Sequence, residues 1–354
     1  MCDAVKGTSI RRARWLGLGA ATAAALALSF AGGGLQAAQA ARPAAKTDAS
    51  IDGLTAKFVD VGGIRTRYYD YGQGEPIVML HGGSRSGANV FSRNIPGLAK
   101  RFRVLAMDRI GYGLTDNPKT AADGGNEGQV RFVKAFIETL KLGPVHLVGH
   151  SGGGAVAFYF AVEHPELVKT LSVLAHGPGM PALGDGPSKI QATLDKCPPV
   201  DSFEHPTCRL AALGYTAATF PPEFWDAERY VLSQPKWKEQ YERQQAARQA
   251  GPAQGAGTNA YRDKMWERAR TEGMKMPVLI YSGKQDTLDW EARDPHSMMK
   301  GELGFFDIVG ARTTRVKMIV VNEGGHFMYR EHPEVFNADL MGFIDFWKNN
   351  PKAQ

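Results

Sequence analysis

Residues 146–156 read HLVGHSGGGAV, a stretch in which Ser151 lies between a histidine and three glycines. An apolar run, PVHLVG, precedes the serine, and the helical pattern AVAFYFAVEHP follows it. Gly149 and Gly153 would allow a strand to turn abruptly into a helix and hold Ser151 strained, with its oxygen exposed at the end of a sheet. The alternative is a flexible glycine turn with no chemistry. If Ser151 is a nucleophile, the rest of the chain must supply a base, an orienting carboxylate and donors for an oxyanion.

Strand and helix patterns alternate on both sides of this turn. A hairpin is predicted for residues 57–72, and continuous apolar runs typical of strands buried on both faces occur at 76–80, 103–108, 167–176, 276–283 and 315–322. Helical spacing occurs at 88–101, 130–142 and 334–348. This alternation predicts an α/β fold, with a mostly parallel sheet flanked by helices.

The alternation stops for about ninety residues. Residues 178–270 contain no strand pattern but three helical ones, at 187–196, 221–232 and 235–249. We interpret this segment as a helical cap inserted into the sheet domain. The core would then comprise residues 54–177 and 271–354, preceded by a linker at 41–53.

The first forty residues have the composition of an export signal. Arg11 and Arg12 precede an alanine- and leucine-rich run that ends in Ala38-Gln39-Ala40. We expect a secretory signal peptide at 1–40, of general or twin-arginine type, and a periplasmic or secreted protein without stable membrane insertion after cleavage. About half of the formal charge of +6 lies in this segment, so the remainder gives little reason to expect nucleic acid as a partner.

The candidate base and the candidate acid for Ser151 follow the ends of later predicted strands. His326 lies in NEGGHFMY, just after a predicted strand, at the edge where open α/β sheets bind ligands. Asp286 ends the stretch SGKQD after the preceding strand, with Asp289 and Asp294 as the other candidates. His150 is adjacent to the serine, but its side chain is expected to point away. The order Ser151, Asp286, His326 is that of enzymes with a nucleophile on a strand-to-helix turn.

Two backbone N–H groups are predicted to hold the oxyanion. One follows the serine, at Gly152. The second is expected in the loop His81-Gly82-Gly83 after the strand at 76–80, where we choose Gly83.

With these features the chain resembles the α/β-hydrolase fold family. The residues that carry the resemblance are HGG at 81–83, DRIGYGLTD at 108–116, GHSGGG at 149–154, SGKQD at 282–286 and GGHF at 324–327. They span the whole sheet domain and imply an α/β-hydrolase fold with an inserted cap.

A closer likeness is to hydrolases that cleave carbon–carbon bonds in meta-cleavage products. NVFSRNI at 89–95 and REHPEVFNADLMGFI at 330–344 are similar to segments of those enzymes. The chain departs from them at His150, where they usually carry Asn, in the loop 84–87, where they usually carry Gly-Pro-Gly, and at Phe327, where they often carry Trp. The resemblance also implies a cap arginine, with Arg209, Arg229 and Arg243 as candidates.

Three functions follow as hypotheses. The first is an exported serine hydrolase of the carboxylesterase type, acting on a carboxylic ester or lactone, because ring-cleavage products arise inside cells. The second is a carbon–carbon bond hydrolase acting on a dienoate ketone. The third is a ligand-binding protein with a vestigial triad. A small-molecule substrate is expected, with no cofactor and no metal, since no metal-ligand pattern, P-loop or dinucleotide fingerprint occurs.

The cap contributes two further predictions. Its aromatic residues, together with the residue after His326, would form an apolar roof over the substrate pocket: Phe220, Phe224, Trp225, Tyr230, Trp237 and Phe327. Cys197 and Cys208 lie eleven residues apart beside prolines, and in an exported protein we expect them to form a disulfide.

Overall fold

A computed structural model describes residues 47–175, 195–199, 202–249, 256–286 and 298–351. The predicted signal at 1–40, and all but the end of the first predicted cap helix, lie outside these residues. In the described ranges, no helix combines the length and the hydropathy needed to cross a membrane.

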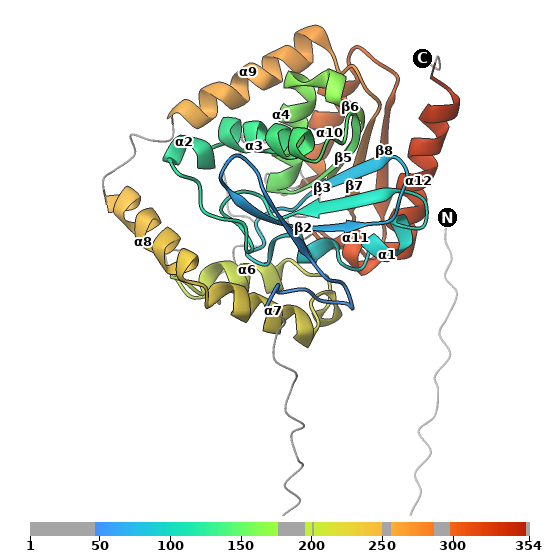
Figure 1. The fold of residues 1–354 in the computed structure, drawn as a ribbon. Coiled ribbons are helices and arrows are strands. Elements are labelled where there is room, and N and C mark those ends of the chain that lie inside the picture. The colour runs from blue at the N-terminus through green and yellow to red at the C-terminus, as the bar shows by residue number, and fades with distance from the viewer. Residues whose placement is uncertain (1–46, 176–194, 200–201, 250–255, 287–297, 352–354) are drawn as a thin grey trace, which may run out of the picture. The chain divides into compact units, whose positions relative to one another are not determined.

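The fold is built on one eight-stranded sheet of order β1-β2-β4-β3-β5-β6-β7-β8 (Figure 1). β1 and β2 form the predicted hairpin, and β2 pairs antiparallel with β4. Every other pairing is parallel. All residues of β5 and β7 are buried, as expected for central strands covered on both faces. The strands are β1 (Lys57–Asp60), β2 (Arg65–Tyr71), β3 (Pro76–Leu80), β4 (Arg103–Met107), β5 (Val145–His150), β6 (Val168–Leu174), β7 (Val278–Gly283) and β8 (Val316–Val321).

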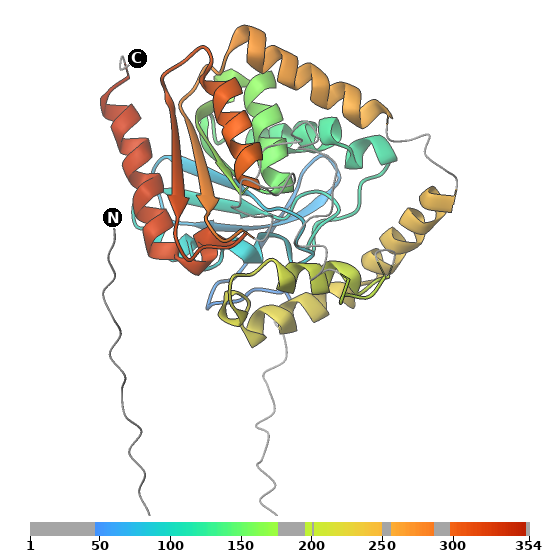
Figure 2. The ribbon, with the colours of Figure 1, turned by 180° about the vertical axis from the view of Figure 1, so that it is seen from behind.

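Helices cover both faces of the sheet. One face carries α3 (Asn126–Thr139), α4 (Gly152–Glu163), α9 (Ala256–Glu272) and α10 (Met298–Gly310), whose apolar side chains form one core cluster with the strands. The other face carries α1 (Ile95–Leu98) and α12 (Pro333–Asn349), whose side chains join a second cluster (Figure 2). The predicted α/β-hydrolase fold is confirmed. Shorter helices are η1 (Gly87–Phe91), α2 (Ala121–Gly124), η2 (Pro165–Leu167) and α11 (Met328–Glu331).

The cap packs on the second cluster. Leu210, Phe224 and Val231 are buried there together with Phe327, which directly follows the predicted catalytic histidine. Its described elements are α6 (His205–Ala212), η3 (Ala217–Thr219), α7 (Pro222–Leu232) and α8 (Pro235–Gln249).

The structure differs from the predicted cap boundary at α9. Most of this helix falls within 178–270, yet it packs against α3, α4 and α10 of the core. Met265, Trp266 and Ala269 bury its apolar side in the first cluster. The cap therefore ends before α9.

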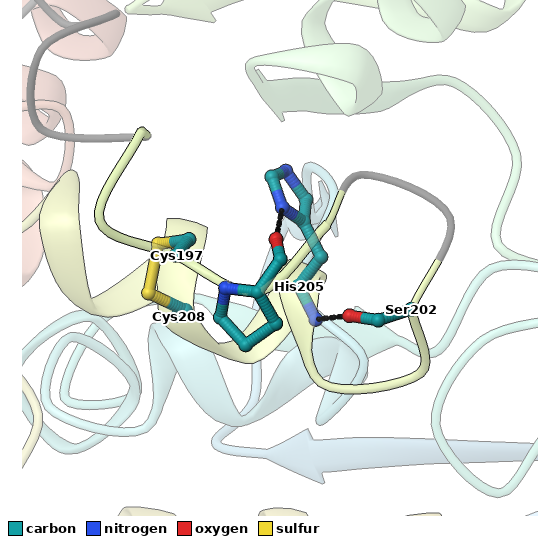
Figure 3. Close-up of a disulfide and its surroundings, with 5 residues drawn as sticks. Cys197, Ser202, His205 and Cys208 are labelled. Carbon is teal, nitrogen blue, oxygen red and sulfur yellow. Dashed lines mark hydrogen bonds between the residues drawn. A yellow bond between two sulfur atoms is a disulfide. The ribbon is translucent and has the colours of Figure 1, made fainter.

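The predicted disulfide is present. Cys197 and Cys208 are bonded, with their α-carbons 5.7 Å apart. The bridge joins the first turn of α6 to the segment before it (Figure 3). In the same segment, His205 donates from Nδ1 to the carbonyl oxygen of Pro198 at 2.8 Å, and its backbone N–H donates to Ser202 Oγ at 3.1 Å. These bonds and the bridge fix the start of α6.

Candidate active site

Ser151 occupies a strained turn between β5 and α4. Its φ is 50° and its ψ is −126°, a region that residues with a β-carbon rarely adopt. Such a conformation costs on the order of 1–3 kcal/mol and persists only where the surroundings enforce it. Here the backbone N–H of Ser151 donates to Leu174 O at 2.9 Å, and its carbonyl accepts from Gly154 N at 2.7 Å. The predicted strand-to-helix turn is therefore present.

The neighbouring glycines are required by close packing. A β-carbon on Gly149 would lie 2.4 Å from Gly153 O, and one on Gly153 would lie 2.2 Å from Leu80 O. A β-carbon on Gly82 would lie 2.8 Å from the β-carbon of Ser151. The glycines thus let β3, β5 and α4 converge around the serine.

His326 and Asp286 form a buried pair at the carboxyl ends of β8 and β7. His326 Nδ1 and Asp286 Oδ2 are 2.8 Å apart, and the two residues are only 4% and 5% exposed. The loops can approach because Gly283 has no side chain: a β-carbon there would lie 2.3 Å from Gly325 O. The structure thus brings together the predicted base and acid. The other candidates for the acid, Asp289 and Asp294, lie outside the described residues.

Ser151 and His326 line a common cavity of about 390 Å³. The walls come from the loops at the sheet edge and from α6 and the turn after it. The lining residues are Gly83, His150, Ser151, His205, Pro206, Arg209, Leu210, Leu213, His326 and Phe327.

The two predicted oxyanion donors lie beside the serine. Gly83 lines the cavity, and Gly152 is the first residue of α4, where helix N–H groups lack internal acceptors. Within the described part of the chain, neither backbone N–H has a hydrogen-bond acceptor. Both groups are therefore available to an oxygen atom bound at Ser151.

His150 contacts the candidate base. It is among the residues that line the cavity, and its ring centroid lies 4.7 Å from that of the His326 ring. His150 Nε2 donates to the carbonyl oxygen of His326 at 2.8 Å. The residue before Ser151 thus anchors the backbone of the predicted base, a role that its position in the sequence does not reveal.

The structure places the six residues of the predicted aromatic roof in different surroundings. Of the six proposed residues, only Phe327 lines the cavity with Ser151. Phe220 and Phe224 are 4% and 0% exposed and pack in the core cluster, with Trp225 and Tyr230 against it. Aromatic residues at helical spacing here serve cap packing, and α6, which sequence analysis missed, forms the wall.

A smaller chamber of about 150 Å³ adjoins the cavity and shares Gly83 and Pro206 with it. Trp237, the remaining member of the predicted roof, lines this chamber. The other lining residues are mostly polar: Arg85, Tyr112, Gln240 and Tyr241.

The three candidate cap arginines differ in their position relative to the cavity. Arg209 lines the main cavity. Arg229 pairs with Asp226 on α7, and Arg243 pairs with Glu239 on α8. Only Arg209 among the three is placed to contact a molecule bound at Ser151.

A second carboxyl group lies near the pair. Glu302 on α10 is 2% exposed and accepts a hydrogen bond from Ser282 Oγ, four residues before Asp286. Burial, with a smaller contribution from the charge of Asp286, raises the pKa of Glu302 to about 8. Glu302 therefore carries a proton at neutral pH and adds no full negative charge beside Asp286. No group of three or more metal-ligating side chains is found among the residues described.

The raised pKa predicts how stability depends on pH. Between the ordinary glutamate value of 4.5 and about 8, folded Glu302 keeps a proton that the unfolded chain has lost, so the free energy of unfolding falls as pH rises. We expect Glu302→Gln to melt close to wild type at pH 4.5 and higher than wild type at pH 8, by on the order of a few degrees. Thermal melts at both values test this, with Glu267→Gln on exposed α9 surface as control. Parallel pH profiles for all three proteins would contradict the assignment.

Comparison with known proteins identifies the family. Residues 75–333 match the model of the alpha/beta hydrolase fold. A 2-hydroxy-6-oxononadienedioate/2-hydroxy-6-oxononatrienedioate hydrolase of Paraburkholderia xenovorans is 26% identical over 84% of this chain and 97% of that protein. A 2-hydroxy-6-oxo-6-(2'-aminophenyl)hexa-2,4-dienoic acid hydrolase of Metapseudomonas resinovorans is 35% identical, but the match covers 36% of this chain and only 44% of the relative.

Solved structures agree at the level of the fold. A meta-cleavage product hydrolase from Pseudomonas fluorescens is similar with a TM-score of 0.62 and 21% identity, covering 82% of this chain and 98% of that one. The family model spans most of the chain, from before β3 to the start of α12, and includes every residue of the candidate site. The chain belongs to the α/β-hydrolase fold family.

Proposed function

We propose that the protein is a serine hydrolase in which Ser151 attacks a substrate carbonyl carbon. The observation that carries this proposal is the Asp286–His326 pair, with Nδ1 and Oδ2 2.8 Å apart, in which His326 lines the same cavity as the strained serine. His326 takes the proton of Ser151 and delivers it to the leaving group, while Asp286 holds the imidazole in the productive tautomer. The N–H groups of Gly83 and Gly152 hold the oxyanion. Water then releases the acyl group by the reverse sequence.

We place carbon–carbon bond cleavage in a dienoate ketone first among the possible reactions. The names of the relatives above support this choice, and so does the position of Arg209, which suits a substrate carboxylate. In its hydroxydienoate form such a ketone first tautomerises: the enol proton moves to the carbon that will depart, and the carbon beside the carboxylate becomes a keto group. When the carbon–carbon bond breaks, its electron pair passes through the remaining double bond to that keto oxygen, which takes the proton that His326 carries. The hydroxyl of water remains on the acyl product.

Hydrolysis of a carboxylic ester is the second candidate. The Cys197–Cys208 disulfide favours it, because disulfides persist in oxidising compartments. Ester hydrolysis is consistent with our proposal that the chain is exported and cleaved after Ala40. If it is, the intact mass of the protein from a periplasmic fraction should correspond to a chain that begins at Ala41. Full-length protein in the cytosol would remove the reason for preferring esters.

Direct comparison of substrates distinguishes the two reactions. Purified protein would be assayed with a dienoate ketone and with p-nitrophenyl esters of several chain lengths, with Ser151→Ala as the blank. A higher kcat/KM for the ketone supports carbon–carbon cleavage, and activity on esters alone refutes it. If a serine-reactive phosphonate fails to label Ser151 and neither class is hydrolysed, the binding-protein hypothesis replaces both.

The role of Arg209 makes a separate prediction. A charge-assisted hydrogen bond contributes about 1.5–3 kcal/mol, so Arg209→Met should raise KM for a carboxylate-bearing ketone by roughly 10- to 100-fold. The kcat/KM of the Arg209→Met variant for neutral p-nitrophenyl acetate should stay near that of the wild type. Arg229→Met and Arg243→Met are matched controls, since both arginines pair on the cap surface. An equal loss on both substrates would show that Arg209 does not recognise the carboxylate.

A further inference from the structure

A buried guanidinium lies behind the loop that carries Gly83. Arg109 follows the end of β4 and is only 5% exposed. Its Nη2 donates to the carbonyl oxygen of Gly82 at 2.9 Å. A β-carbon built on Gly152 would lie 3.8 Å from the same Nη2. One buried cation is therefore next to both segments that supply the proposed oxyanion donors.

The contact to Gly82 bears directly on Gly83. The carbonyl of Gly82 and the N–H of Gly83 belong to one peptide unit, and in a planar trans peptide they point in opposite directions. A donor that holds the carbonyl oxygen therefore sets the direction of the N–H. Because that N–H has no acceptor among the described residues, its direction is fixed from the carbonyl side.

His81 holds the same carbonyl oxygen. Its Nε2 accepts from the backbone N–H of Arg109 at 3.0 Å, so the proton of the neutral ring is on Nδ1, which donates to Gly82 O at 2.9 Å. Burial, followed by the charge of Arg109, lowers the pKa of His81 well below its ordinary range and keeps the ring neutral. The Gly82 carbonyl thus receives two hydrogen bonds of defined direction.

Within the described part of the chain, no carboxylate pairs with the charge of Arg109. Among the described residues Arg109 forms no ion pair, and its carbon Cζ lies 4.5 Å from the centroid of the Tyr112 ring. Burying a guanidinium without an acid is costly, although burial lowers its pKa without removing its charge at neutral pH. An anion that forms during the reaction next to Gly83 and Gly152 would supply an opposite charge that the described residues do not.

We infer that Arg109 and His81 are positioning residues, which aim the Gly83 N–H at the oxyanion, and that the Arg109 charge stabilises the anionic tetrahedral intermediate. The inference rests on the proposed serine mechanism and extends it to the residues behind the donors. Stabilisation that exists only when the anion forms raises kcat and leaves substrate binding unchanged. Loss of Arg109 should therefore lower kcat without raising KM.

The test compares Arg109→Met with Arg109→Lys on whichever substrate the wild type hydrolyses. Removing one oxyanion donor costs about 10²- to 10³-fold in kcat, and we expect a loss of this order for Arg109→Met, with KM near wild type. Affinity for a boronic acid, which forms an anionic tetrahedral adduct with Ser151, should fall by a similar factor. Arg109→Lys should recover part of both losses. Unchanged kcat, or a loss of kcat with unchanged boronate affinity, would overturn the inference.

A second pair of variants covers the case in which Arg109→Met does not fold. His81→Asn can keep an amide donor near the position of Nδ1, whereas His81→Leu cannot. The inference requires higher kcat in His81→Asn than in His81→Leu at equal melting temperature, and equal kcat would refute it. Labelling of the wild type by a serine-reactive phosphonate distinguishes failure of the proposed function from failure of this inference. If the wild type does not react, the proposed function is refuted. If the wild type reacts but kcat is unchanged in the Arg109 and His81 variants, only this inference is refuted.

Discussion

Ser151→Ala should lower kcat by about 10⁴-fold or more, on an ester or a dienoate ketone alike. Alanine keeps the β-carbon, so the strained turn and the hydrogen bonds of its backbone to Leu174 and Gly154 can persist. Only the attacking oxygen is lost. The residual rate then reflects the oxyanion donors and substrate binding, which the substitution leaves in place.

Steady-state kinetics with an unchanged melting temperature would establish this result. The variant should also retain affinity for substrate analogues, because the cavity walls are unaltered. A correctly folded Ser151→Ala protein that keeps most of its activity would exclude a serine nucleophile in both proposed reactions.

Asp286→Asn should reduce kcat by a comparable factor, about 10⁴-fold. The carboxylate accepts the Nδ1 proton of His326, and this bond leaves Nε2 as the basic nitrogen for the serine. An amide can donate to Nδ1 instead and thereby stabilise the wrong tautomer. The geometry of the site would remain, while the base would no longer accept a proton.

The matched controls are Asp289→Asn and Asp294→Asn, the other carboxylates considered from the sequence. Both should retain activity close to wild type. If either abolishes activity while Asp286→Asn does not, the orienting acid is misassigned even though Asp286 contacts His326.

The sheet and the site at its edge could be predicted because both depend on local sequence. Central parallel strands are buried on both faces and appear as continuous apolar runs, as in PIVML and PVHLVG. Once these strands are placed, Asp286 and His326 follow the ends of β7 and β8. The direction of parallel strands then brings the two residues to the edge that also holds Ser151.

The wall of the cavity could not be predicted in the same way. Spacing in α7 shows that Phe224 and Val231 share a face of the helix, but not whether that face meets the substrate or the core. The choice depends on where α6 lies, and the contact of His205 and Arg209 with the cavity follows from tertiary packing. For the same reason α9, which sequence analysis did not predict, was placed in the cap segment although it packs on the core.

The Cys197–Cys208 disulfide is expected to affect substrate selectivity and turnover differently. The residues of the proposed chemistry follow strands of an extensive buried sheet. The residues proposed for recognition lie on α6, which is eight residues long and too short to be stable without support. The bridge holds the first turn of that helix and closes a loop of eleven residues, which stabilises it by about 2–3 kcal/mol. Production in a reducing cytosol would therefore yield an enzyme that still reacts with small activated substrates but discriminates poorly among natural ones. We therefore expect oxidation of the two cysteines to affect selectivity among substrates rather than turnover.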